Sequence, residues 1–544
     1  MNTRQLQTDK NQKLYHALLG ILLVCALAMM MLLSYWACKY SYYGAVDGRT
    51  RGVLVGDKTW AHIAVFLAAS LCAMGIDKVL MKKDKSQQEK ICLCTLIVTS
   101  VIAFILGVFY VCKNPYYPVG DQINTTAFAA YCRDGNFSML SIGGYVGMYQ
   151  QQKGLAILYE ILFTLFGDFN YRPAKILHVV WWILTILAGY GFLKLNTDRP
   201  VFRMLYCVMM LGCFPLLFYL PYIYGDVLSI SFGIILFYGV AAYEHSGQKR
   251  YIALASFAAG LAVLARKNTW IVLVAVTVYV LLVSLRKKKV RYLMAGTAIL
   301  LTAALSVKAV DVIYEVRSGY PSGVGIPSIL WVAMGLQETE GRAGVYNRYQ
   351  QATFTDYDCQ QELAAQQGKE YIRERLEEFS QDPGMAFNFF KNKVEGQWIE
   401  PMYAALESTE SFEEGAELSP VLESLYYGEL GRTIWKLTNY YQSILYLAGL
   451  MALVMLGILW WKKKEVPISL WLPWIAVFGG FLFSILWEAK SRYVFPYCVF
   501  MILYAPEGLY QTGLLLCKLP KLRKFKKSGH TQDKGEEASL RETA

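Results

Sequence analysis

Charged residues are scarce in this chain of 544 residues. Asp, Glu, Lys and Arg together make up 17% of the sequence, whereas hydrophobic residues make up 55%. A soluble enzyme keeps about a quarter of its residues charged, because its surface is in water. The shortage excludes an ordinary soluble protein and predicts a chain whose apolar surface is covered by membrane lipid.

Signatures of metal and disulfide chemistry are also lacking. The five histidines are scattered without the spacing of a metal site. Most of the 12 cysteines lie inside apolar stretches, where cysteine acts as a small hydrophobic residue. Cys112 and Cys132 bracket one polar loop and could pair, but two cysteines in so long a chain are a weak disulfide signal. No metal site is predicted.

A cleavable signal peptide is missing as well. The first apolar stretch, Tyr15 to Cys38, is not followed by a small-residue cleavage site, which predicts a retained span. The net charge is +12, but the basic residues gather in short loops beside the apolar stretches. This pattern is typical of membrane topology and lipid headgroups, so we expect no nucleic acid as a partner.

What the sequence does have is a series of apolar segments near the roughly 20 residues that cross a bilayer as a helix. Because Lys and Arg are retained on the cytoplasmic side, basic clusters fix the direction of each crossing and place both termini in the cytoplasm. Twelve spans are expected, at residues 15–38, 60–81, 91–112, 174–193, 204–222, 227–243, 251–265, 270–285, 292–312, 441–461, 467–487 and 494–516.

The predicted fold is therefore an all-α polytopic membrane protein. One apolar segment, 154–167, is only fourteen residues long and carries Glu160, so we expect a helix lying flat at the outer surface. The long polar region before the tenth span is expected to form a mainly helical extracytoplasmic domain. The expected divisions are an N-terminal hairpin (1–81), a transmembrane module with outer loop 113–173 (82–311), the late domain (312–440), the last spans (441–516) and a cytoplasmic tail (517–544).

Ionisable residues at the outer ends of the spans are the candidates for chemistry, because charge near hydrocarbon is costly and usually functional. Asp121 follows the third span, and Asp226 lies in a tight turn between two spans, where each residue could also be a helix cap or a solvated side chain. The turns LARKNTW and EAKSRY place basic residues on the outer side of the membrane, where Lys and Arg are disfavoured. This position suggests that they bind an anion. These turns contribute Arg266, Lys267, Glu488, Lys490 and Arg492.

These segments resemble the GT-C superfamily of integral membrane glycosyltransferases, in particular its protein mannosyltransferases and aminoarabinose transferases (family 39). An acidic residue in a long early outer loop, followed by a surface helix, is matched here by Asp121 and segment 154–167. The stretches YQQQKGLAILYEILFTLFGDFNYRPAKIL, LARKNTWI and EAKSRYVFPY are similar to further family segments. The chain departs from the family because its acid follows the third span instead of the first and has no adjacent acidic partner.

The resemblance implies a polyprenyl-phosphate-linked sugar as donor and inversion at the anomeric carbon. It implies that Asp121 accepts the proton of the attacking hydroxyl, that Asp226 supports it, and that Arg266, Lys267 and Arg492 bind the donor phosphate. The acceptor is a glycan, lipid or protein, and a divalent metal is an open cofactor because the superfamily varies in this respect. Candidate residues for binding the acceptor or sugar are Tyr117, Gln151, Tyr224, Glu488 and Trp398.

Alternatives remain open at this point. Asp47 and Asp57, in the loop of the first hairpin, are competing acids. An O-antigen-type polymerase or ligase has a similar number of spans, but would place its key residues in the late loop. A lipid-linked saccharide transporter would need charges in mid-membrane, and the spans have few. The short loops favour a bacterial plasma membrane.

Overall fold

The computed structural model describes residues 3–44, 52–323, 325–464 and 466–518. These described residues contain nine helices long and apolar enough to cross a bilayer, which indicates a multi-pass membrane protein. The nine are built on α1 (Thr3–Lys39), α2 (Thr59–Leu80), α3 (Lys85–Lys113), α7 (Arg172–Asn196), α10 (Asp226–Ser246), α12 (Trp270–Lys287), α13 (Arg291–Ser318), α20 (Glu429–Trp461) and α21 (Leu472–Leu486).

Three further expected spans are shorter or interrupted. Segment 204–222 is divided into α8 (Pro200–Leu211) and α9 (Phe214–Phe218), because Gly212 ends α8 and Pro215 begins the next turn. Segment 251–265 is one helix of 17 residues, α11 (Lys249–Ala265). Segment 494–516 begins as α22 (Ser491–Met501) and resumes as helix at 505 after a turn. Twelve crossings therefore stay a prediction.

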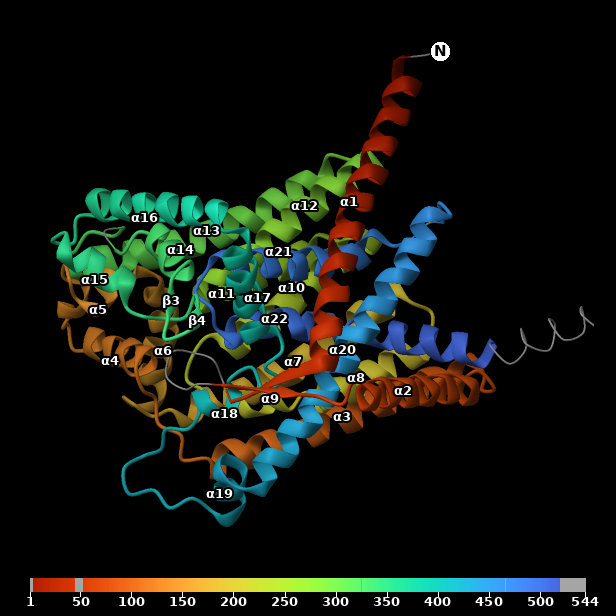
Figure 1. The fold of residues 1–544 in the computed structure, drawn as a ribbon, viewed down its shortest axis with the longest axis horizontal. Helices are drawn as coiled ribbons and strands as arrows, with labels where there is room; N and C mark the ends of the chain where they lie inside the picture. The colour runs from red at the N-terminus through yellow and green to blue at the C-terminus, as the bar shows by residue number, and fades with distance from the viewer. Residues whose placement is uncertain (1–2, 45–51, 324, 465, 519–544) are drawn as a thin grey trace, which may run out of the picture.

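The N-terminal hairpin includes a small ribbon that an all-helical prediction did not contain. Strands β1 (Tyr40–Tyr43) and β2 (Val53–Gly56) pair antiparallel between α1 and α2, with Tyr40 opposite Gly56. Helix α1 packs along α20, and its first turns extend beyond the rest of the molecule in Figure 1. Near the ribbon, the side chain of Asn439 in α20 donates to both carboxylate oxygens of Asp57 at 3.1 and 3.2 Å.

The loop after α3 contains short helices that pack on one another. They are α4 (Asp121–Arg133), η1 (Ser138–Leu140), α5 (Tyr145–Met148), η2 (Gln150–Gln152) and α6 (Lys153–Phe166). Helix α6 confirms that the 154–167 segment is helical, and Tyr314 Oη of α13 donates to its Glu160 at 3.1 Å. Cys112 is exposed and Cys132 is buried, and both are free thiols in the structure.

The late polar region is mainly helical, and it begins only where α13 ends at Ser318. Its elements are α14 (Ile329–Gly335), the ribbon β3 (Glu338–Thr339) and β4 (Arg342–Ala343), α15 (Tyr349–Asp356), α16 (Gln361–Gln381), α17 (Pro383–Trp398), α18 (Ala405–Ser408) and α19 (Pro420–Tyr427). Met148 of α5 shares a small core with Leu330 and Phe354 of this region. The helices α4, α5, α14 and α15 accordingly gather at one end of the molecule (Figure 1).

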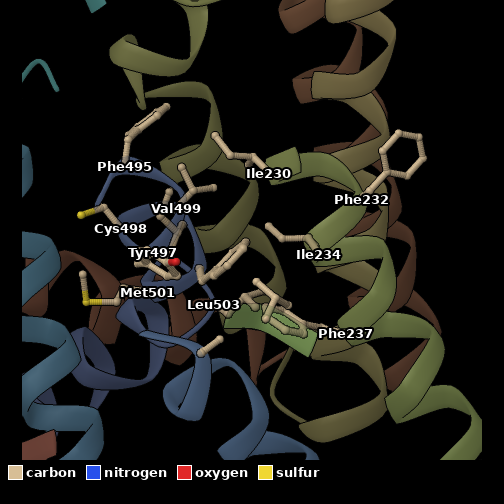
Figure 2. Close-up of a cluster of buried hydrophobic side chains, with 14 of the residues drawn as sticks. Ile230, Phe232, Ile234, Phe237, Phe495, Tyr497, Cys498, Val499, Met501 and Leu503 are labelled. Carbon is tan, nitrogen blue, oxygen red and sulfur yellow. The ribbon is translucent and has the colours of Figure 1, made fainter. Parts of the chain in front are cut away.

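Helix α10 forms the centre of the membrane part. It is apolar on all sides. Of its most apolar stretch of 18 residues, 83% is buried, which is more than in any other of the nine spans among the described residues. It packs against α7, α11 and α22. Figure 2 shows Ile230, Ile234 and Phe237 of α10 close to α22 side chains that include Val499. This core fixes where the first residues of α10 and α22 lie.

Candidate functional site

Three charged side chains from three elements meet at one end of α10. Asp226 is the first residue of α10 and only 2% exposed. Arg266, directly after α11, places Nη1 2.5 Å from its Oδ1. Arg492, near the start of α22, places Nη1 3.9 Å from its Oδ2. We call Asp226, Arg266 and Arg492 the charged cluster.

Local sequence explains why these residues approach so closely. A Cβ on Gly225 would lie 2.1 Å from the carbonyl oxygen of Ala265, so only glycine lets the start of α10 touch the end of α11. Asp226 lies at the positive end of the α10 dipole, and Arg266 follows the negative end of α11. Both placements are electrostatically favourable.

Tyrosine rings surround the two guanidinium groups. The Arg266 guanidinium lies 5.3 Å from the ring centre of Tyr224, and that of Arg492 also lies 5.3 Å from it. Arg492 Nη1 donates to Tyr222 Oη. Burial, aided by Asp226, raises the pKa of Tyr222 to about 12 although Arg492 opposes the rise. The phenols therefore stay protonated and can serve as hydrogen-bond donors.

Asp121 lies on the same side of the molecule as the charged cluster, but it is not part of that cluster. It is the first residue of α4 and is exposed, and its Oδ1 accepts a hydrogen bond from Tyr145 Oη at 2.9 Å. Burial raises the pKa of Tyr224; Asp121 adds to the rise, and Arg266 and Arg492 oppose it. Asp121 and the two arginines thus act electrostatically on one phenol.

Glu488 interacts electrostatically with both Asp121 and the charged cluster. It precedes α22, is 6% exposed and accepts from Tyr493 Oη at 3.4 Å. Burial raises its pKa; Lys490 and Arg492 oppose the rise, while the carboxylate of Asp121 adds to it. Glu488 therefore lies within electrostatic range of both Asp121 and the charged cluster.

Two cavities open on this face. The smaller one, of about 20 Å³, is lined by the charged cluster, Tyr493 and other residues, and it has room for about one water molecule. The larger one, of about 350 Å³, is lined by Lys267 and Gln151 together with apolar side chains that include Trp270, Val307 and Val310. We call the larger cavity the lateral groove. Asp121 lines neither cavity.

The structure therefore separates Lys267 from Arg266, its neighbour in the sequence. Lys267 is exposed, and its Nζ donates to Ser328 Oγ at 3.2 Å. Lys153, a second cation of the lateral groove, is buried and ion-paired with Asp311, and it donates to Ser322 Oγ at 3.1 Å. Among the described residues, Lys153 has a carboxylate partner within 4 Å and Lys267 has none.

Other predicted residues lie apart from this arrangement. Trp398 is fully buried, and its Nε1 donates to Ser484 Oγ at 3.0 Å, so it packs inside the protein and does not present a face to a sugar. Tyr117 is 37% exposed and stacks edge-on with Tyr171. Asp57 is held by Asn439 beside the β1–β2 ribbon, and Asp47 lies outside the described residues.

Sequence reasoning missed several residues of the site. Gln152 donates to Tyr224 Oη at 2.6 Å, whereas Gln151, which was predicted, faces the lateral groove. Tyr145 and Tyr222, which bond Asp121 and Arg492, were also missed. The spacing in PYIYGD offered one signal, because it places two tyrosines beside the rim carboxylate.

The described residues contain no group of three or more His, Cys, Asp or Glu side chains that could hold a metal ion. The arrangement joins buried cations, protonated phenols and one accessible carboxylate beside a partly apolar groove. These groups can bind an anion and accept a proton. A search of protein-family models and a search of curated proteins each find no match to this chain.

Proposed function

We propose that the protein is a glycosyltransferase that moves a sugar from a polyprenyl-phosphate donor to an acceptor hydroxyl on the outer face of the membrane. The observation that supports this most is that Arg266 and Arg492 converge on Asp226, while Lys267, the residue after Arg266, lines the lateral groove. A lipid phosphate needs cations at the membrane boundary and an apolar path for its chain. The charged cluster and the groove supply both.

In this proposal the lateral groove takes the first part of the isoprenoid. Trp270, Val307 and Val310 supply its apolar wall, and Lys267 contacts the phosphate from the groove side. Arg266 and Arg492 stabilise the phosphate as it leaves with additional negative charge. Because the small cavity has room for only about one water molecule, the phosphate enters it as the ring of Tyr493 moves aside.

The acceptor oxygen attacks the anomeric carbon from the face opposite the phosphate. The bond between that carbon and the phosphate oxygen breaks, and the lipid phosphate keeps the electron pair. Asp121 takes the proton of the acceptor hydroxyl, and Tyr145 holds its carboxylate by one hydrogen bond. Asp226 is a positioning residue, because its carboxylate is engaged by Arg266.

The test is the Asp121→Asn variant in membranes supplied with polyprenyl-phosphate hexoses. Release of polyprenyl phosphate should fall by about 10²-fold or more, since a positioned base contributes a factor of this size. Asp134→Asn is the matched control, because Asp134 is an exposed carboxylate at the other end of α4. Release at the wild-type rate by Asp121→Asn would remove the proposed base.

The donor site has a separate test. Lys267→Gln should raise the KM for the donor several-fold and leave that for the acceptor unchanged, because only the donor carries phosphate. Lys113→Gln is the control, since Lys113 is exposed at the end of α3, before the loop that holds Asp121, and lines neither cavity. A larger change in the acceptor KM would assign the groove to another ligand.

A further inference from the structure

Aromatic side chains from two separate parts of the chain form a continuous row that begins at Asp121. Tyr145 Oη donates to the carboxylate of Asp121, and the ring centre of Tyr145 lies 5.1 Å from that of Tyr149. The ring centre of Tyr149 lies 6.2 Å from that of Trp331, and the two rings meet edge to face. Tyr145 and Tyr149 belong to the loop after α3, whereas Trp331 belongs to α14. The row therefore leads from the loop into the late region.

Tyr346, between β4 and α15, adds a third phenol to this row. Its side chain is 37% exposed. Burial raises the pKa of Tyr149, and Tyr346 and then Asp121 add to the rise. Burial also raises the pKa of Tyr346, and Asp121 again adds to the rise. The two phenols and the carboxylate therefore lie within electrostatic range of one another. We call Tyr145, Tyr149, Trp331 and Tyr346 the aromatic strip.

The rings of the aromatic strip are held from behind but still reach the surface. Trp331 stacks in parallel on Trp487, with the ring centres 5.9 Å apart and an angle of 4° between the planes. Gln350 is fully buried, and it opposes the rise in pKa of both Tyr149 and Tyr346, so its amide lies against these phenols. Each member of the strip keeps part of its surface exposed. A surface fixed in this way loses little conformational entropy when a ligand binds.

The aromatic strip is separate from the lateral groove, although one short segment contributes to both. Met148 and Gln150 line the lateral groove, whereas Tyr145 and Tyr149 do not. The α5–η2 segment thus presents different side chains to the groove and to the strip. Asp121, at the end of the strip, lines neither the groove nor the small cavity. A ligand on the strip therefore reaches the proposed base without entering the path of the donor lipid.

The chemistry of the aromatic strip indicates the kind of ligand. A pyranose ring has an apolar face of C–H groups and a rim of hydroxyls. Aromatic rings cover such a face, and phenol hydroxyls bond such a rim. Protonated phenols and an indole carry no charge, and Asp121 at the end of the strip disfavours an anion. A peptide is bound chiefly through its main chain, for example at the edge of a sheet, whereas the strip offers side chains.

We propose that the aromatic strip binds an uncharged carbohydrate, so that the acceptor of the proposed sugar transfer is a hydroxyl of a glycan chain. The role as acceptor rests on the proposed function, but binding of the glycan needs no donor. The reacting sugar lies beside Asp121 and Tyr145, and the following sugars lie along Tyr149 and Trp331. Tyr346 contacts the glycan from the late region. The loop after α3 and the late region thus build the acceptor site together.

The experiment measures binding of the purified full-length protein in detergent, without donor, to arrayed neutral oligosaccharides and to arrayed peptides that contain Ser and Thr. We expect binding to oligosaccharides and none to peptides. Tyr346→Ala should weaken the Kd of the tightest oligosaccharide about tenfold, because one aromatic contact is lost. Tyr346→Phe keeps the ring and should stay within about threefold of the wild type. Equal losses in the two variants would overturn the stacking contact.

The matched control is Tyr427→Ala, since Tyr427 is 56% exposed at the end of α19, away from α5 and α14 in Figure 1. It removes the same side chain and should keep the Kd within about twofold. Binding of peptides alone would overturn the proposal in favour of a protein acceptor, and binding of neither would show that the strip only packs. Release of polyprenyl phosphate by a wild type that binds no oligosaccharide would overturn this inference alone. Oligosaccharide binding without such release would support the carbohydrate site and count against the sugar transfer.

Discussion

The two ends of α12 handle positive charge in opposite ways. At the start of the helix, the arginines of the charged cluster are buried and share the carboxylate of Asp226. At its other end, Lys288, Lys463 and Lys464 are exposed and line, with Arg286, a cavity of about 320 Å³ that we call the basic cavity. One helix thus joins a site whose charges are buried to a site whose lysines reach water.

The difference follows from burial. A guanidinium group taken out of water loses several kcal/mol of hydration, and an ion pair with further hydrogen bonds restores it. Arg492 is 6% exposed and has Asp226, Tyr222 and a ring of tyrosines around it. An exposed lysine keeps its water and needs no partner. The charged cluster should therefore be rigid and intolerant of change, whereas the basic cavity should tolerate substitution.

Asp226→Asn is the substitution expected to have the largest effect. It leaves Arg266 and Arg492 facing one another without their shared carboxylate, and breaking a buried pair in this way costs about 3–5 kcal/mol. The free energy of unfolding in detergent, followed by thermal or denaturant unfolding, should fall by that amount. The exposed Asp121→Asn serves as the comparison and should change it by less than about 0.5 kcal/mol. A fully stable Asp226→Asn protein would contradict the difference between the two ends.

Lys393 offers an intermediate case, a buried cation without an ion pair in the described structure. Lys393, in α17, is 1% exposed and donates to the carbonyl oxygen of Gly335. Burial lowers its pKa to about 7, although Glu488 opposes the shift. A lysine can lose its proton where an arginine cannot, so its burial is relieved by deprotonation.

The pH dependence of this residue follows from the direction of the shift. Between about pH 7 and the ordinary lysine pKa, the unfolded chain binds one proton more than the folded chain, so stability rises with pH across this window. The Lys393→Met variant lacks this ionisable group and therefore this dependence of stability on pH. Its advantage in unfolding free energy over the wild type should shrink by about 3 kcal/mol as the pH is raised from 7 to 9.5. An advantage that stays constant with pH would show that Lys393 is not held neutral.

Sequence patterns predicted much of this architecture because hydrophobic length and basic clusters are local properties. Nine of the expected spans appear as long helices, and the helix at 154–167 is present. The sequence predicted that Asp121 and Asp226 meet the basic turns at one site. The structure brings Asp226 together with Arg266 and Arg492, whereas Asp121 lies outside this cluster. In that case the reasoning needed only that the ends of the spans lie at one level.

What the sequence could not supply were the contacts set by tertiary packing. Interruption of the 204–222 segment depends on how α8 and α9 fit against their neighbours. A helix turns about 100° per residue, so the assignment of Gln151 instead of Gln152 to Tyr224 could not be made without the rotation of η2 and α6. Trp398 was predicted to contact sugar because aromatic residues do so, but its burial against Ser484 comes from the approach of α17 to α21.

The smallest expected effect tests the open end of α12 directly. In lipid-free detergent, Lys463→Gln/Lys464→Gln should change the free energy of unfolding by less than about 0.5 kcal/mol, because both lysines are exposed and lose no carboxylate. A variant that is clearly less stable than the wild type would mean that the lysines support the fold itself, and the two ends of α12 would then differ in degree and not in kind.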